Sequence, residues 1–330
     1  MKSIFLNTAL ALALIIGFTS CESSSDYEDE TPSIANIAVS NSDFSTLEAA
    51  AIQGGLAITL SNSNAGDPSG NFTVFAPTND AFSRLGLNSE TLGVLQDGFL
   101  TNTLLYHTSN GDLMGSQLST DQPASSLLGL NRRFVERDGE LFINGSKILA
   151  TDVPASNGTV HVIDKVMIAT GGDIVQSALA LQNADVFITP ELTFLVEAVL
   201  YAELAEALTA SEGSPSFTVF APTDQAFKDL GTALGLTFEV PADIRQLPQD
   251  VVASVLLNHV VNDGGKFTSE MFEGNTAPLG GDALMYGPYM NGTLGITGQG
   301  NQAPANMVIP DVQATNGVIH VIDQVLLPVL

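Results

Sequence analysis

The chain is poor in cysteine and in basic residues, and each shortage excludes a class of protein. Its single cysteine, Cys21, has no partner for an internal disulfide, so an exported form must be held together by its core alone. Lysine and arginine number 10 against 36 aspartates and glutamates. Phosphate binding needs clustered Lys and Arg, so this balance argues against a nucleic-acid partner and against direct docking on anionic lipid.

Local enzyme signatures are also missing. The sequence contains no GxSxG, HExxH, GxxxxGK[ST] or GxGxxG motif, and no twelve-residue calcium loop with the Asp/Asn pattern. We therefore expect a protein that is not an enzyme and that needs neither a cofactor nor a metal. The alternative is an envelope enzyme whose active-site residues do not form a recognisable local sequence motif.

The first 21 residues are typical of a targeting segment. Lys2 gives a positive start, and the apolar run Ala9–Phe18 is shorter than the roughly 20 residues that a membrane span needs. Small residues then lead to Cys21, which resembles the signal of a bacterial lipoprotein, so we predict lipidation at Cys21. An ordinary signal peptide or an uncleaved anchor is the alternative.

Residues 22–32 form an acidic stretch with almost no apolar side chains, which predicts a flexible tether. In some Gram-negative groups, acidic residues just after the lipidated cysteine accompany export to the outer face. By this analogy we expect an anchor in the outer membrane and surface exposure. A plain spacer is the alternative.

The rest of the chain contains two copies of one sequence pattern. Phe72–Phe82 reads FTVFAPTNDAF and Phe217–Phe227 reads FTVFAPTDQAF, and two further blocks repeat in the same order: LLYH and LLNH, then NGTVHVID and NGVIHVID. Such a repeat indicates duplication of a whole domain. We predict domain 1 over residues 33–170 and domain 2 over residues 174–330. The link Gly171-Gly172 is so short that the two domains should touch.

Within each copy, helical spacing comes early and strand patterns come late, which predicts an α+β unit. Leu92–His107 is a predicted helix. Phe134–Arg137 and Glu140–Ile143 flank Asp138-Gly139, a favoured hairpin turn. Val160–Met167 is the predicted closing strand.

The three repeated blocks resemble the signatures of the fasciclin-type domain family. The resemblance covers nearly all of the chain beyond residue 32, and it implies two tandem fasciclin-like domains. Each would have a helical N-terminal part packed on a compact β-sandwich or wedge. The central Tyr-His pair of the family is present as Tyr106-His107, but the second copy has Asn258 before His259. This departure leaves the fold expectation unchanged and weakens any function tied to the pair in domain 2.

All four histidines lie in the repeated blocks: His107, His259, His161 and His320. They could be metal ligands or acid–base groups, or buried rings whose nitrogens are satisfied by the backbone. Neither His107 nor His161 has a local carboxylate or cysteine at ligand spacing, so we expect the structural role. In the resembling family the central histidine is understood to support the fold.

Four carboxylates near the motifs are candidate ligand-binding residues. Asp80 and Asp224 follow the two APT blocks, where the resembling family is implicated in adhesion, although capping of a helix is the simpler role. Asp164 and Asp323 lie in the last motif, which is implicated in receptor recognition by animal members of that family.

The sequence thus predicts a lipid-anchored adhesion or binding protein of the bacterial envelope, with a matrix, glycan or protein ligand that it does not identify. A structural or accessory lipoprotein facing the periplasm, without an external ligand, is the alternative. Tandem copies allow two weak contacts to act together.

Overall fold

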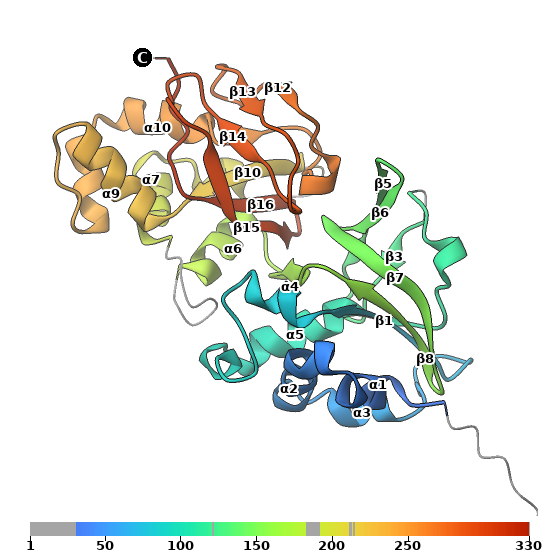
Figure 1. Cartoon of the computed structure of the whole chain (residues 1–330). Coiled ribbons are helices and arrows are strands. Elements are labelled where there is room, and N and C mark those ends of the chain that lie inside the picture. The colour runs from blue at the N-terminus through green and yellow to red at the C-terminus, as the bar shows by residue number, and fades with distance from the viewer. Residues whose placement is uncertain (1–30, 121, 183–191, 211–212, 214, 330) are drawn as a thin grey trace, which may run out of the picture. The chain divides into compact units, whose positions relative to one another are not determined.

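In both copies of the repeat most strands follow the helices, but the first strand lies between two groups of helices (Figure 1). The computed structural model describes residues 31–120, 122–182, 192–210, 213 and 215–329, and residues 31–330 form one compact unit. The predicted signal, Cys21 and residues 22–30 of the predicted tether lie outside the described residues.

The elements of domain 1 are α1 (Ile34–Ser40), η1 (Ser42–Phe44), α2 (Ser45–Gln53), α3 (Ala57–Ser61), β1 (Phe72–Pro77), α4 (Asn79–Ser83), η2 (Leu92–Val94), α5 (Asp97–His107), β2 (Thr108–Asn110), η3 (Gly115–Gln117), β3 (Ala124–Ser125), β4 (Asn131–Arg132), β5 (Phe134–Arg137), β6 (Glu140–Ile143), β7 (Ser146–Ala155), β8 (Gly158–Ile163) and β9 (Ile168–Ala169).

Those of domain 2 are α6 (Ile174–Leu181), α7 (Thr193–Tyr201), α8 (Ala205–Leu208), β10 (Phe217–Pro222), α9 (Asp224–Ala233), η4 (Pro241–Gln246), α10 (Gln249–Leu257), β11 (Val260–Val261), η5 (Thr268–Glu270), β12 (Gly274–Thr276), β13 (Leu284–Tyr286), β14 (Gly295–Thr297), β15 (Ala305–Ala314) and β16 (Gly317–Ile322).

Both domains build their main sheet in the same order. Domain 1 runs β2-β1-β8-β7-β6-β5, and domain 2 runs β11-β10-β16-β15-β14-β13-β12. The repeated FTVFAP strands, β1 and β10, pair in parallel with the closing strands β8 and β16. All six residues of each FTVFAP strand are buried, which explains why the block is apolar on both faces.

The first block ends each strand and starts a helix. Thr78 Oγ1 accepts a hydrogen bond from Ala81 N at the start of α4, and Thr223 does the same for Ala226 at the start of α9. These caps satisfy backbone N–H groups that have no partner inside the helix. The repeated Ala-Pro-Thr residues therefore end the strand and supply the cap of the following helix.

Most predicted elements of domain 1 are present, with three shifted boundaries, one of which is the start of the closing strand at Gly158 in place of Val160. The hairpin of β5 and β6 is confirmed. The predicted helix 92–107 is a 3-10 turn followed by α5, which begins at Asp97. The predicted strand 160–167 ends at Ile163, because Asp164 turns its carboxylate back to accept a hydrogen bond from Lys147 N.

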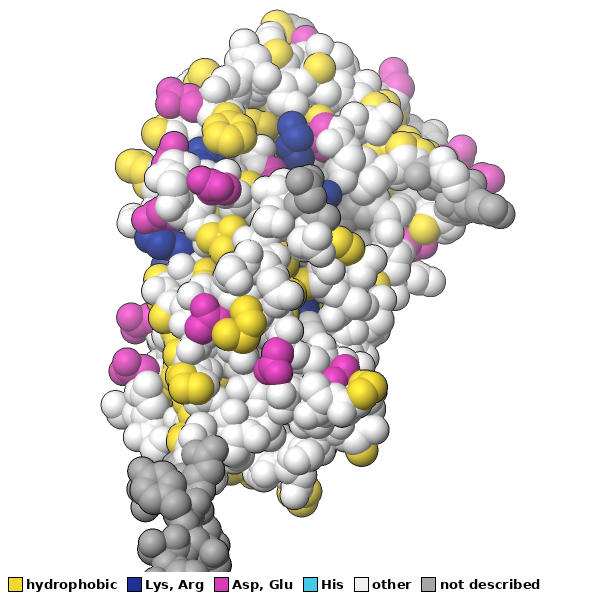
Figure 2. Space-filling model, turned by 90° about the vertical axis from the view of Figure 1, so that its right-hand side faces the viewer, with side chains coloured by type: hydrophobic (Ala, Val, Ile, Leu, Met, Phe, Trp, Pro, Cys, Tyr) yellow, Lys and Arg dark blue, Asp and Glu magenta, His cyan; other side chains and the backbone are white. Residues whose placement is uncertain are grey.

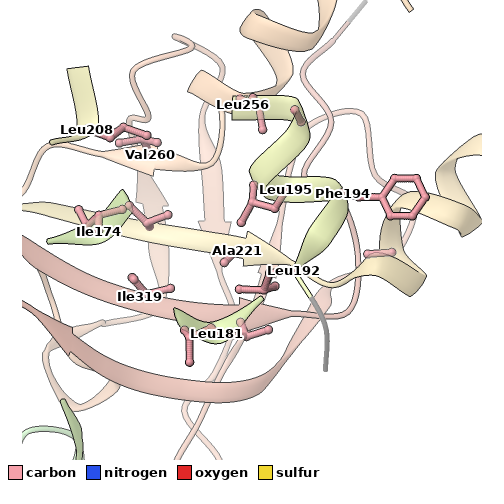
Figure 3. Packing of buried hydrophobic residues seen from close by; sticks show 14 of the residues in the cluster. Ile174, Leu181, Leu192, Phe194, Leu195, Leu208, Ala221, Leu256, Val260 and Ile319 are labelled. Carbon is pink, nitrogen blue, oxygen red and sulfur yellow. The ribbon is translucent and has the colours of Figure 1, made fainter. Parts of the chain in front are cut away.

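The core of each domain lies between its helices and its sheet. In domain 2, Leu195 and Leu256 on helices face Ala221 and Ile319 on strands (Figure 3). An equivalent cluster in domain 1 joins α1, α2 and α5 to β1 and β8. Further clusters fill the opposite side of each sheet. Each domain therefore has a core between its helices and sheet, and the core of domain 2 also includes Ile168 of domain 1.

The two domains are in contact, as the two-residue link predicts. Strand β9, at the end of domain 1, pairs in parallel with β15 of domain 2, with Ile168 opposite Val312 and Ala169 opposite Gln313. The last strand of domain 1 thereby extends the sheet of domain 2.

Candidate functional site

The central histidines are buried and hydrogen bonded on both ring nitrogens. His107 Nδ1 donates to Thr103 O at 2.7 Å, and its Nε2 accepts from Met167 N at 3.0 Å. His259 makes the same pair with Val255 O at 2.8 Å and Leu326 N at 2.8 Å. Each ring therefore ties the end of a helix to the segment after the closing strand.

The strand histidines are held in the same way. His161 Nε2 donates to Leu113 O and its Nδ1 accepts from Asp152 N. His320 bonds to Lys266 O and Asp311 N. Among the described residues, no group of three or more His, Cys, Asp and Glu side chains is placed to hold a metal ion. These contacts favour the structural role that the sequence predicts.

Burial lowers the pKa of both central histidines. The pKa of His107 falls to about 4, and so does that of His259, because desolvation disfavours the charged ring. Burial also lowers the pKa of His161 and His320. The four rings are therefore neutral in the folded protein near neutral pH.

This pKa shift predicts loss of stability on acidification. Below the ordinary pKa of 6.5, His107 is protonated in the unfolded chain, but in the folded chain it is not protonated until the pH falls to about 4. The free energy of unfolding should keep its full value above pH 6.5. It should decrease as the pH drops toward 4, by on the order of 3 kcal/mol for each central histidine. Urea denaturation at a series of pH values measures the slope.

The variant His107→Gln is the control for this prediction. It has no titrating ring, so its stability should fall less steeply than that of the wild type between pH 6.5 and 4. The difference between the two curves removes the contribution of the carboxylates, which both proteins share. Equal slopes would show that His107 is not the group that resists protonation.

The four candidate carboxylates do not come together in one site. Asp80 is exposed on the first turn of α4. Asp224 is buried, and its oxygens accept from Thr193 Oγ1 and Phe194 N. Asp164 binds Lys147 N, and its domain 2 counterpart Asp323 binds Asn306 N and Nδ2. Only Asp80 presents its carboxylate to solvent without such an internal contact, so a ligand role for these residues remains a prediction.

A buried ion pair joins the two domains. The sequence alone did not indicate this site. Lys165 Nζ lies 2.6 Å from Asp311 Oδ2, with side chains only 10% and 8% exposed. The same ammonium donates to Gly292 O and to Thr268 Oγ1. Asp311 also accepts from Thr268 N at 2.6 Å. Both charges are thus hydrogen bonded, which a buried pair requires.

Arginines of domain 1 surround this pair. Arg133 donates to Gly265 O at 2.6 Å and to Glu270 Oε2 at 2.8 Å. Arg137 donates to Met271 O at 2.7 Å and lies 4.2 Å from the centre of the Tyr289 ring. Arg84 donates to Asn291 O at 2.7 Å. We call these three arginines with Lys165 and Asp311 the junction cluster.

Tyr106 of the Tyr-His motif also belongs to the domain contact. Its hydroxyl donates to Gln313 Oε1 of domain 2 and accepts from Asn144 Nδ2. Burial raises the pKa of this phenol, so it stays a donor. Asn258, at the same place in domain 2, instead donates to Leu326 O within its own domain. The Tyr106 hydroxyl thus contacts the other domain, whereas the Asn258 amide donates to a carbonyl of its own domain.

Comparison with known proteins agrees with the repeat. A family model for the fasciclin domain matches residues 42–169 and 190–328. The chain belongs to the fasciclin domain family. This confirms the predicted family and the α+β fold of two tandem fasciclin domains.

Several fasciclin relatives resemble the chain over different lengths. Protein sll1483 of Synechocystis sp. is 37% identical over 142 residues, which are 42% of this chain and 75% of that protein. Transforming growth factor-beta-induced protein ig-h3 of Sus scrofa is 30% identical over 269 residues, 78% of this chain but 35% of that protein. Human periostin is 28% identical over 268 residues, 28% of its length. The chain thus spans about a third of these animal relatives.

A solved structure of a fasciclin domain pair, from the insect cell adhesion molecule Fasciclin I, matches with 18% identity and a TM-score of 0.39. The match covers 78% of this chain and 88% of that one.

Proposed function

We propose that this protein is a lipid-anchored adhesion or binding protein of the bacterial cell envelope. Two joined fasciclin domains would face matrix, glycan or protein ligands. Support comes from membership of the fasciclin family, which includes the animal proteins ig-h3 and periostin. The lipoprotein-like sequence at Cys21 supports the anchor.

The observation that carries the proposal is where the few lysine and arginine side chains lie and which groups they contact. The four cations of the junction cluster bridge the two domains. Lys147, Lys266 and Arg245 pair with carboxylates of their own domain. The remaining surface is rich in carboxylates, and Asp and Glu outnumber Lys and Arg on the face in Figure 2. Such a surface favours a cationic partner, or an anionic glycan bridged by divalent cations.

The location is part of the proposal. None of the helices in the described part of the chain is both long and apolar enough to cross a bilayer. Acyl groups on Cys21 would supply the attachment, and the acidic residues 22–32 would keep the domains away from anionic headgroups. By the analogy drawn from those acidic residues, the proposed location is the outer face of the outer membrane.

The anchor is tested by the variant Cys21→Ala. Cells that produce it should lose the protein from the membrane fraction, and their retention on a surface coated with a cationic protein should fall several-fold. Retention of wild-type cells should decrease as NaCl is raised, because salt screens the attraction. Ser24→Ala, which keeps the cysteine, is the matched control.

Two results would overturn the proposal. If Cys21→Ala stays in the membrane fraction, the anchor is wrong. If cells lacking the protein adhere as well as the wild type to cationic coats, and to an anionic polysaccharide with calcium, then an accessory role without an external ligand replaces adhesion.

A further inference from the structure

Each domain contains an apolar cavity between its first helices and the face of its main sheet. In domain 1 a cavity of about 220 Å³ lies between α1, α2, α3 and the strands β1 and β8. In domain 2 a cavity of about 100 Å³ lies between α6, α7, α8 and the strands β10 and β16. Figure 3 shows side chains around the second cavity, with Leu195 and Ile174 approaching from different elements.

The two cavities occupy corresponding positions of the repeat. Ile34 N donates to Asn157 Oδ1 in domain 1, and Ile174 N donates to Asn316 Oδ1 in domain 2, which aligns α1 with α6. In this alignment Ala38 corresponds to Ala178. Both line their cavity, as do many other corresponding pairs. The cavity is therefore a feature of the domain that both copies retain, although their helices differ in sequence.

The surfaces that line the two cavities consist almost entirely of carbon atoms. His107 and His259 each line one cavity, but both nitrogens of both rings are already hydrogen bonded. Neither set of described lining residues contains a lysine or an arginine. A buried charge would have no partner there, and an apolar group would need none.

Apolar side chains also stand exposed among the lining residues of both cavities. In domain 1, Val39 and Ile52 are 61% and 64% exposed. In domain 2, Leu179 and Leu200 are 47% and 57% exposed. Both copies thus have exposed apolar side chains at the edge of an apolar cavity. This arrangement indicates a route of entry for an apolar ligand and not imperfect core packing.

The geometry points to a binding site in each domain for one hydrocarbon chain of an uncharged amphiphile. An apolar cavity of roughly 150 Å³ holds a molecule of the size of benzene, so these cavities suit a segment of alkyl chain. The polar head would remain in solvent beside an acidic surface without a lysine or arginine in the described lining, which disfavours an anionic head.

The site is tested by titrating the full chain with normal alcohols. The chain carries Cys21→Ser, so that no acyl group is attached, and its Ile, Leu and Val methyl groups are followed by NMR. n-Decanol should shift the signals of Leu47 and Leu195 saturably. From hexanol to decanol, each added methylene should tighten binding about four-fold until the cavity is full. Decanoate should bind about ten-fold more weakly than decanol, because its charge meets an acidic surface.

Filling variants locate the site. Ala38→Phe should abolish the shift in domain 1 and leave domain 2 responsive, and Ala178→Phe should do the reverse. Ala180→Phe, an exposed position on α6 outside the lining, should bind as the wild type does.

Three outcomes overturn the inference. One is the absence of a saturable shift with any alcohol. Another is equal binding by the filling variants and the wild type. The third is a wild-type dimer, seen by sedimentation, that Ala38→Phe or Ala178→Phe dissociates, since a second copy would then cover the cavity.

Discussion

Replacing Lys165 with methionine should lower the free energy of unfolding by about 3–5 kcal/mol. The methionine fills much of the space of the lysine stem, but it leaves the carboxylate of Asp311 buried without its cation. Breaking one side of a buried pair costs this much because the remaining charge stays desolvated. Urea denaturation of the wild type and Lys165→Met measures the effect.

The double variant Lys165→Met/Asp311→Asn should recover most of the loss. Asparagine can keep the hydrogen bond from Thr268 N, and it tolerates the positive φ of 66° at this position. Lys147→Met is the matched control, because the pair of Lys147 with Glu140 is partly exposed and such pairs contribute about 0–1 kcal/mol. A loss below 1 kcal/mol for Lys165→Met would show that the buried pair does not hold the domains together.

Gly158→Ala should destabilise domain 1 by at least about 3 kcal/mol or prevent its folding. Gly158 is the position of β8 that pairs with Phe72 of β1 in the parallel ladder. A Cβ there would lie well within 3.0 Å of the backbone of Phe72, and the φ of 146° is strained for other residues. Strand β1 would have to separate from β8, and backbone overlap of this kind cannot be relieved by a rotamer change.

Gly98→Ala is the control for this substitution. Gly98 lies in α5, and a Cβ there meets no atom within 4 Å. Alanine favours helix over glycine by up to about 1 kcal/mol, so this variant should be slightly more stable than the wild type. If Gly158→Ala unfolds within 1 kcal/mol of the wild type, the close approach of β1 and β8 is not a requirement of the fold.

Local signals made much of the fold predictable. The FTVFAP strands, their threonine caps and the Asp138-Gly139 hairpin are each encoded by a few adjacent residues. Duplication repeated these signals at matching places and so predicted two tandem fasciclin domains, which the family model matches over residues 42–169 and 190–328. The helix boundary at Asp97 was missed because Leu92 and Val94 continue the apolar spacing through a 3-10 turn.

The junction cluster and the cavities depend on contacts between distant residues. Arg132, Arg133 and Arg137 stand close together in the sequence, yet Arg132 is fully buried within domain 1 while the other two reach domain 2. No local pattern separates these roles. The concentration of cations in domain 1 and their scarcity in domain 2 was the one available signal of an electrostatic contact between the copies.

Protease digestion of intact cells tests the central claim that the domain pair is displayed outward on a lipid anchor. An endopeptidase that cuts after glutamate suits the experiment, because residues 22–30 contain three glutamates and no lysine or arginine. Intact cells should release both domains together in one fragment, because the link Gly171-Gly172 contains no glutamate and the domains are held to each other by the junction cluster. Protection of the protein until the outer membrane is broken would contradict the account.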